Sequence, residues 1–263
     1  MTETEWLNSI DPIAMIEYLR ETLASEDTAA RQDYREQFDE ASRTGHERKF
    51  RLFACACCRR IWDRIPEDCN RDAVVAVEDY LAGRLSGSEL WTALVASSAV
   101  EGKSDGSGKR SEQGYWAVKY LGRGFYKMSA AESSLIVASK VLFLTDEQYG
   151  WESGVGHASF GRFRWPLPIP AKVDAERATQ AALLRCVFGN PIHPIDFNAA
   201  WRSPNVIDIA RRVYDDRAFD HMPILADALQ DAGCEIDEIL NHCRGSGPHI
   251  KGCWVVDACL EKS

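Results

Sequence analysis

The stretch from Leu225 to Cys259 constrains the fold of this chain more than any other. Three short apolar patterns follow one another there with almost no connecting sequence. The first begins at Pro223, which suits the start of a helix because its missing N–H would be unpaired there. It ends at Gly233, which enters the left-handed region without steric cost. A second helical stripe runs to Arg244, and a third, almost wholly apolar, begins at Gly252. The stretch therefore predicts two amphipathic helices followed by a buried one.

Helical periodicity dominates the rest of the chain as well. In the N-terminal half, apolar residues recur on one broad face from Glu47 to Ile65, and Pro66 ends the pattern. Ser129 and Glu132 have the spacing of a capping box at a helix start. Further helices are expected at residues 11–23, 72–81, 88–100, 115–121, 129–144, 173–188 and 206–214. Since no segment has a convincing strand pattern, we predict one all-α, helical-bundle-like domain over residues 1–263, with about nine helices.

Two segments depart from the helical pattern. Residues 101–114 are rich in Gly and Ser and contain no apolar anchor, which predicts a flexible loop. In residues 150–170, apolar residues alternate with prolines and arginines, which predicts an extended proline-rich arm. Such an arm either wraps onto its own core or docks on another chain. In the second case Phe163 and Trp165 would contact the partner.

Composition narrows the classes of function. The formal net charge is −9, which argues against general binding to nucleic acid or to an anionic membrane. No run approaches the roughly 18 apolar residues of a membrane span, and the acidic, polar N-terminus is unlike a secretory signal. Nine cysteines, an odd number, then indicate reduced thiols. We therefore expect an acidic, cysteine-rich protein of the cytoplasm.

Two groups of motifs stand at the ends of the chain. The C-terminal group comprises FGNP at 188–191, PILADAL at 223–229, HCR at 242–244 and GCWVVD at 252–257. The N-terminal motif is RLFACACCRRIW at 51–62. Together they resemble the signatures of a family of uncharacterised bacterial proteins. The resemblance implies that both ends belong to one folded unit. Because the family has no established activity, it assigns no catalytic residue.

The cysteines of the N-terminal motif differ in their expected surroundings. Cys57 and Cys58 fall on the apolar stripe, where buried thiols are inert. Cys55 lies off that stripe, four residues from both Arg51 and Arg59. Two guanidinium charges would favour the thiolate, so Cys55 is the expected reactive thiol.

The C-terminal stretch offers four side chains that could ligate zinc: His242, Cys243, His249 and Cys253. Zinc prefers tetrahedral nitrogen and sulfur ligands. However, neighbouring helical residues point about 100° apart, and the spacings of familiar zinc fingers are absent. If the two ends of the chain pack together, Cys55 or Cys57 could complete the site. The alternative is that Cys243 and Cys253 fill the core.

Charged residues give two weaker signals. Arg48, Arg51 and Arg59 belong to a basic helix that could hold an acidic partner, or could pair with acidic segments of the same chain. The group at 215–221 contains Asp215, Asp216, Asp220 and His221. A solvated turn is its simplest interpretation, since no hydrolase or nucleotide-binding motif accompanies it.

The leading prediction is thus a non-enzymatic helical interaction or scaffold module with a protein partner and no cofactor. The alternative is a cysteine-dependent metal-binding or redox protein built on Cys55 and the turn from His242 to Cys253, with zinc as the metal. A third hypothesis is a hydrolase that uses the group at 215–221.

Overall fold

The computed structural model describes residues 1–27, 45–65, 67–99, 117–122, 129–145 and 171–262. Within these ranges the chain is all-α without a strand, and nine helices have seven or more residues, which confirms the predicted fold class. The helices are α1 (Glu3–Asn8), α2 (Pro12–Asp27), α3 (Gly45–Arg60), α4 (Asp68–Leu81), α5 (Gly87–Ser98), α7 (Ala130–Thr145), α8 (Ala171–Phe188), α9 (Pro204–Asp215), α10 (Met222–Asp231), α11 (Asp237–Arg244) and α12 (Trp254–Cys259). The expected loop at 101–114 and the expected arm at 150–170, with Phe163 and Trp165, lie outside the described residues.

Local sequence signals account for many of the helix ends. The predicted capping box of Ser129 and Glu132 is present, with each side chain accepting a hydrogen bond from the other residue's backbone N–H. A second box at Ser86 starts α5, and Gly233 follows α10 with a φ of 91°. The expected long helix to Ile65 is shorter: α3 ends at Arg60, and a single 3-10 turn follows it. None of the helices in the described ranges is both long and apolar enough to span a bilayer.

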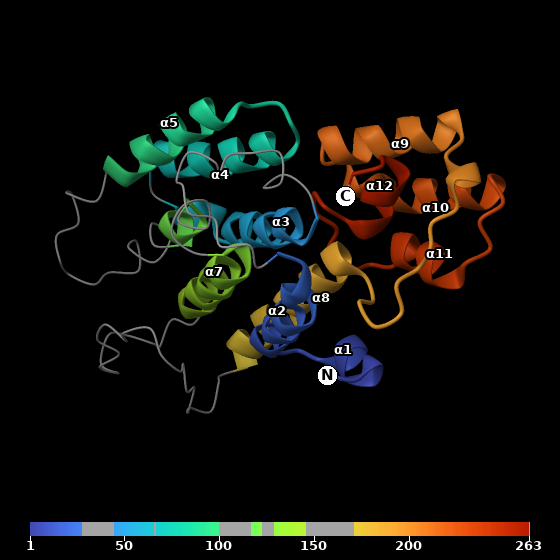
Figure 1. Ribbon diagram of the computed structural model, residues 1–263, viewed down its shortest axis with the longest axis horizontal. Coiled ribbons are helices and arrows are strands. Elements are labelled where there is room, and N and C mark those ends of the chain that lie inside the picture. The colour runs from blue at the N-terminus through green and yellow to red at the C-terminus, as the bar shows by residue number, and fades with distance from the viewer. Residues whose placement is uncertain (28–44, 66, 100–116, 123–128, 146–170, 263) are drawn as a thin grey trace.

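The apolar side chains form two clusters. The N-terminal cluster contains residues of α1 to α5, α7 and α8 and of the segment 117–121, and the C-terminal cluster lies mainly among α9 to α12. Figure 1 shows α9 to α12 gathered on one side of the molecule and α3, α4, α5 and α7 on the other. Helix α8 belongs to both: Leu184 and Val187 are in the N-terminal cluster, whereas Cys186 is in the C-terminal cluster. The last turn of α8 is therefore where the two clusters meet.

Helix α3 is buried on almost every side. Helices α4, α7 and α8 all pack against it, and every residue from Phe50 to Cys58 is buried. A single apolar stripe predicted only one covered face. The additional cover means that even Arg48 and Arg51 retain only 2% and 3% exposure.

Buried and half-buried polar contacts join the two clusters. The guanidinium of Arg48 in α3 donates to both carboxylate oxygens of Asp257 in α12 and, from Nη2, to the hydroxyl of Tyr214 at 3.1 Å. Arg59 in α3 and Arg217, after α9, both donate to the carboxylate of Glu78 in α4. The two ends of the chain, which the terminal motifs predict to form one unit, thus do pack together.

Candidate metal centre

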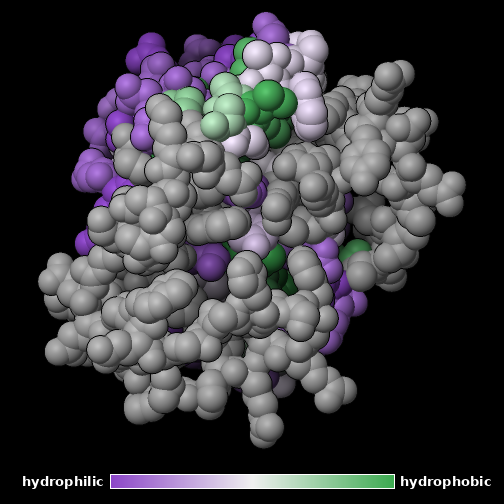
Figure 2. Space-filling model, turned by 90° about the vertical axis from the view of Figure 1, so that its left-hand side faces the viewer, coloured by the Kyte–Doolittle hydropathy of each residue, from purple (hydrophilic) through white to green (hydrophobic). Residues whose placement is uncertain are grey.

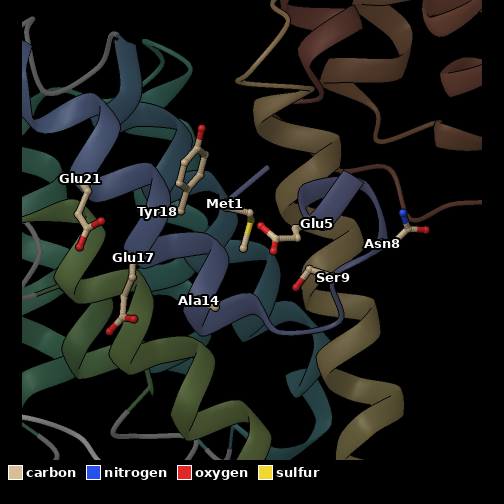
Figure 3. A pocket seen from close by; sticks show the side chains of 8 residues that line it. All are labelled: Met1, Glu5, Asn8, Ser9, Ala14, Glu17, Tyr18 and Glu21. Carbon is tan, nitrogen blue, oxygen red and sulfur yellow. The ribbon is translucent and has the colours of Figure 1, made fainter. Parts of the chain in front are cut away.

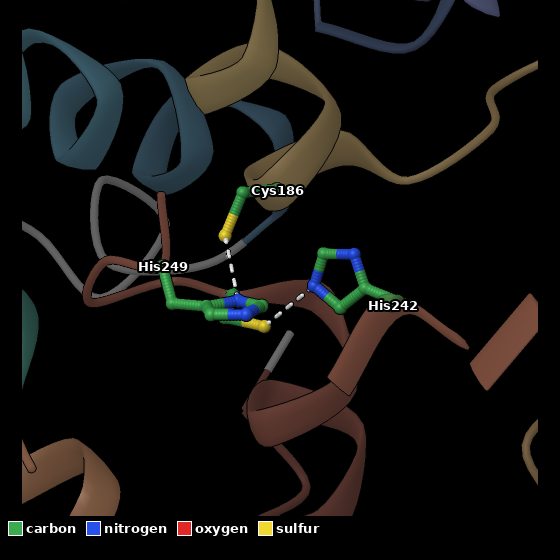
Figure 4. Close-up of side chains that lie close together, drawn as sticks. Cys186, His242 and His249 are labelled. Atoms are coloured by element: carbon green, nitrogen blue, oxygen red, sulfur yellow. Dashed lines mark hydrogen bonds between the residues drawn. The ribbon is translucent and has the colours of Figure 1, made fainter. Parts of the chain in front are cut away.

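Four metal-ligand side chains converge where the two clusters meet. Cys186 comes from the last turn of α8, and His242 comes from the second half of α11. His249 lies in the turn between α11 and α12, and Cys253 is the N-cap residue of α12. In Figure 4, Cys186, His242 and His249 approach one another from these separate elements. One potential ligand atom from each of the four residues lies within 4.8 Å of the others.

The distances suit a tetrahedral ion. His242 Nε2 is 3.2 Å from Cys253 Sγ, and Cys186 Sγ is 3.9 Å from His249 Nδ1. Zinc binds sulfur at about 2.3 Å and imidazole nitrogen at about 2.0 Å, so the ligand atoms around it are about 3.3 to 3.8 Å apart. All four ligand atoms lie within 4.8 Å of one another, so no pair has to approach by more than about 1.5 Å to enclose an ion.

Two glycines let the backbone bring these ligands together. Gly252 precedes Cys253 with a φ of 90°, and a Cβ there would lie 2.7 Å from Cδ1 of Leu52 in α3. Gly189 follows α8 with a φ of 67°, and its Cβ would lie 3.3 Å from the Trp254 ring. Any other residue would be strained by the left-handed backbone at both positions, and the close approach of Leu52 and Trp254 would add to that strain. The turn carrying Cys253 is thereby held against α3, and Trp254 against the end of α8.

Aromatic rings cover one side of the cluster. The imidazoles of His242 and His249 meet edge to face, with centroids 4.9 Å apart. The indole of Trp254 lies 5.5 Å from the His242 ring. Both histidines and Trp254 are half-buried, whereas Cys186 and Cys253 are buried. The two sulfur atoms thus lie beneath a partly exposed aromatic layer.

The polar atoms of the cluster are incompletely satisfied. His249 Nε2 is buried and has no hydrogen-bond partner within the described part of the chain, although buried polar groups are ordinarily paired. Burial raises the pKa of Cys253, but hydrogen bonds from Cys186, His242 and His249 and the charge of His242 outweigh it, so that the net pKa is well below the usual value. The hydrogen bond to Cys253, followed by burial, raises the pKa of Cys186. The site therefore favours a thiolate at Cys253, the form in which cysteine binds a metal.

The predicted metal ligands are only partly brought together. His242, His249 and Cys253 all belong to the cluster, but the fourth member is Cys186 and not Cys243. Cys243 is buried in the C-terminal apolar cluster, because its side chain leaves α11 about 100° away from that of His242. Neither Cys55 nor Cys57 joins the site. Sequence reasoning missed Cys186, whose only signal was a position next to the FGNP motif.

The prediction of a reactive thiol at Cys55 is wrong for the folded chain. Cys55 is 1% exposed, and burial raises the pKa of its thiol well above the usual value, assisted by the carboxylate of Glu78. Arg59 lowers the pKa but is outweighed. Burial also raises the pKa values of Cys57 and Cys58, as their place on the apolar stripe suggests.

The arginines predicted to bind a partner are engaged within the chain instead. Arg48 pairs with Asp257, Arg51 with Glu47, and Arg59 with Glu78. For these three arginines the alternative, pairing within the same chain, is therefore the one that the structure shows. In the group at 215–221, Asp215, Asp216 and Asp220 are exposed; Asp220 lies 3.9 Å from His221, whereas Asp215 pairs with Arg84.

Two surface features away from the cluster also stand out. A hollow of about 640 Å³ between α1 and α2 is lined by Glu5, Glu17, Glu21 and Tyr18, among others (Figure 3). Figure 2 shows hydrophobic and weakly polar side chains gathered over α5, where Trp91 and Val95 are 46% and 49% exposed. An open acidic hollow and a small apolar area are ordinary surface features, and neither has the convergent geometry of the four metal-ligand side chains.

Comparison of the chain with protein-family models, curated proteins and solved structures finds no match in any of the three. The resemblance suggested by the terminal motifs therefore stays a prediction. The strongest indication of function is the geometry of Cys186, His242, His249 and Cys253 itself.

Proposed function

We propose that this chain is a zinc-binding helical protein in which a structural Cys2His2 centre fastens the C-terminal helices to α8. The observation that carries the proposal is the convergence of Cys186, His242, His249 and Cys253 from three separate elements. Four ligand atoms from separate elements rarely come within 4.8 Å of one another by chance. A shared metal ion would explain why they do.

The donor set favours zinc over other common ions. Calcium and magnesium prefer oxygen ligands, and none of the four side chains supplies one. Thiolate together with imidazole suits zinc, whose structural sites are tetrahedral and have four protein ligands. A catalytic zinc keeps one position for water or substrate. With four protein donors, this site leaves no such position, so the proposed role is structural.

The location explains what the metal would do. Cys186 is fixed in α8, where the neighbouring residues Leu183, Leu184 and Val187 belong to the N-terminal cluster. The three remaining ligands lie in α11 and in the turn before α12. The four ligands come together only when the chain is folded. The free energy of metal binding therefore adds to the stability of the fold. The ion therefore complements the Arg48–Asp257 contact in joining the two clusters.

We place metal binding before a scaffold function because the residues expected to bind a partner are already engaged. The three arginines expected to face a partner are engaged with carboxylates of the same chain. An interaction function stays a prediction, and a metal-stabilised helical module is a suitable framework for one. The hydrolase hypothesis rests on the group at 215–221, whose three carboxylates are exposed in the described part of the chain.

Matched variants test the proposal. The chain is purified without chelator, and its metal content is measured by plasma mass spectrometry before and after zinc is supplied. His242→Asn removes a ligand, whereas Cys243→Ala changes its buried neighbour in α11. Cys186→Ala removes a second ligand, and Cys259→Ala is its control from the same apolar cluster.

We expect one zinc per chain in the unaltered protein and in both controls, and little retained zinc in both ligand variants after dialysis. Circular dichroism on each variant shows whether the fold is kept. Equal zinc content in His242→Asn and Cys243→Ala would refute the assignment of ligands. A folded, unaltered protein that takes up no zinc would refute the function.

A further inference from the structure

We propose that the centre is also a peroxide-sensitive thiol switch, in which Cys186 and Cys253 form a disulfide and release the ion. This inference rests on the proposed zinc function and concerns the regulation of the same site. It begins from the two sulfur atoms, which are the only oxidisable donors of the four ligands. They are at most 4.8 Å apart.

The geometry favours this pair of thiols. A disulfide needs its sulfur atoms at about 2.05 Å, so the proposed step requires rotation of the two side chains and a shift of the segment that carries Cys253. Cys186 stands at the end of a helix and Cys253 at the end of that turn, so neither is locked in mid-helix. In contrast, Cys55, Cys57 and Cys58 share one buried helix, where successive side chains diverge.

The cover over the site selects the oxidant. Cys186 is 1% and Cys253 0% exposed, but the imidazoles of His242 and His249 above them are half-buried. A small, neutral hydroperoxide can pass a half-exposed ring edge during ordinary side-chain motion. A bulky peptide disulfide such as oxidised glutathione has no comparable path to the sulfur atoms.

The reaction balances without any other reagent than the peroxide. The Cys253 thiolate attacks one peroxide oxygen and breaks the O–O bond, which gives a sulfenic acid and, after protonation, one water. Cys186, which as a ligand of the proposed zinc is also held as a thiolate, then attacks the sulfenic sulfur, forming the S–S bond and expelling hydroxide, which becomes a second water. In total, two thiolates lose two electrons, peroxide gains two electrons, and two protons are consumed. A disulfide is no longer a thiolate ligand, so two imidazoles alone remain and the zinc leaves.

The oxidised state is structurally specific. The new disulfide still ties α8 to the start of α12, because it joins Cys186 to Cys253. His242 and His249 lose their common ion, so α11 and the turn at 245–252 lose one of the contacts that hold them, while Ile239 and Leu240 stay packed in the C-terminal cluster. Oxidation is therefore expected to loosen residues 237–252 while the rest of the C-terminal cluster stays folded.

The experiment uses the full chain with Cys69→Ser, because Cys69 is half-buried and is the cysteine most open to unrelated oxidation. The zinc-loaded protein is treated with hydrogen peroxide or, separately, with oxidised glutathione. A chromogenic chelator reports released zinc, non-reducing peptide mass spectrometry locates disulfides, and hydrogen exchange follows residues 237–252.

We expect peroxide to release one zinc for each Cys186–Cys253 disulfide formed, with faster exchange at 237–252. Oxidised glutathione should leave the zinc bound over the same time. Dithiothreitol followed by zinc should restore the starting state. Zinc retained under peroxide, or released with sulfinic acid or a different disulfide, would overturn the switch and leave the zinc function intact. A chain that binds no zinc at the start would instead refute the proposed function.

Discussion

Replacing Asp257 by alanine should destabilise the chain by about 3 to 5 kcal/mol, the usual cost of removing one partner from a buried ion pair. Asp257 and Arg48 are each 2% exposed. Two hydrogen bonds join them, and the second guanidinium nitrogen also donates to Tyr214. In Asp257→Ala the guanidinium stays buried and keeps only the neutral phenol. The loss of solvation of that charge is then no longer compensated.

Urea unfolding followed by circular dichroism measures the change in the free energy of unfolding. The double variant Arg48→Met/Asp257→Leu removes both charges and should be much closer to the unaltered protein than either single variant, because no isolated charge remains. Asp257→Asn retains the shape of the side chain and one acceptor, so its free energy of unfolding should lie between those of Asp257→Ala and the unaltered protein. A cost below about 1 kcal/mol for Asp257→Ala would show that water reaches Arg48 and would refute a dry contact between the two clusters.

Three further predictions follow from particular residues. Gly252→Ala should cost at least about 1 kcal/mol and weaken zinc binding, because of its positive φ and the approach to Leu52; wild-type stability by urea unfolding would contradict this. A maleimide should label Cys69 before Cys55, because Cys55 is buried and its pKa is raised. Peptide mass spectrometry checks the order of labelling, and the reverse order would support the prediction that Cys55 is the reactive thiol. Burial raises the pKa of Glu78, but two arginines lower it below the usual value. Its stabilising effect should therefore be present above about pH 4.3 and be lost as the pH falls through the lower folded value. Glu78→Gln should flatten that acid dependence, and an unchanged pH profile of unfolding would argue against it.

The helices themselves were predictable because their signals are local. The capping box at Ser129 and the terminating Gly233 depend on residues within one or two turns. Burial of α3 was underestimated for the opposite reason. Its cover comes from helices distant in sequence, and no periodicity within α3 could reveal that Arg48 would face Asp257 from the other end of the chain.

The metal centre shows the same limit. His242, His249 and Cys253 lie close in sequence, so their place in one cluster could be predicted. Cys186 is more than fifty positions away, on a helix whose pattern indicates only a buried residue. Its role depends on how α8 ends against the C-terminal helices. Cys243 was a wrong choice because closeness in sequence does not place neighbouring helical side chains on one side.

X-ray absorption at the zinc edge of the purified chain observes the proposed Cys2His2 centre directly. We expect one zinc ion per chain, surrounded by two sulfur atoms at about 2.3 Å and two imidazole nitrogens at about 2.0 Å. In Cys186→Ala one sulfur should disappear from that shell or the zinc should be lost, whereas Cys243→Ala should leave the spectrum unchanged. A shell of oxygen and nitrogen alone, or a spectrum that changes with Cys243 and not with Cys186, would contradict the Cys2His2 centre described above.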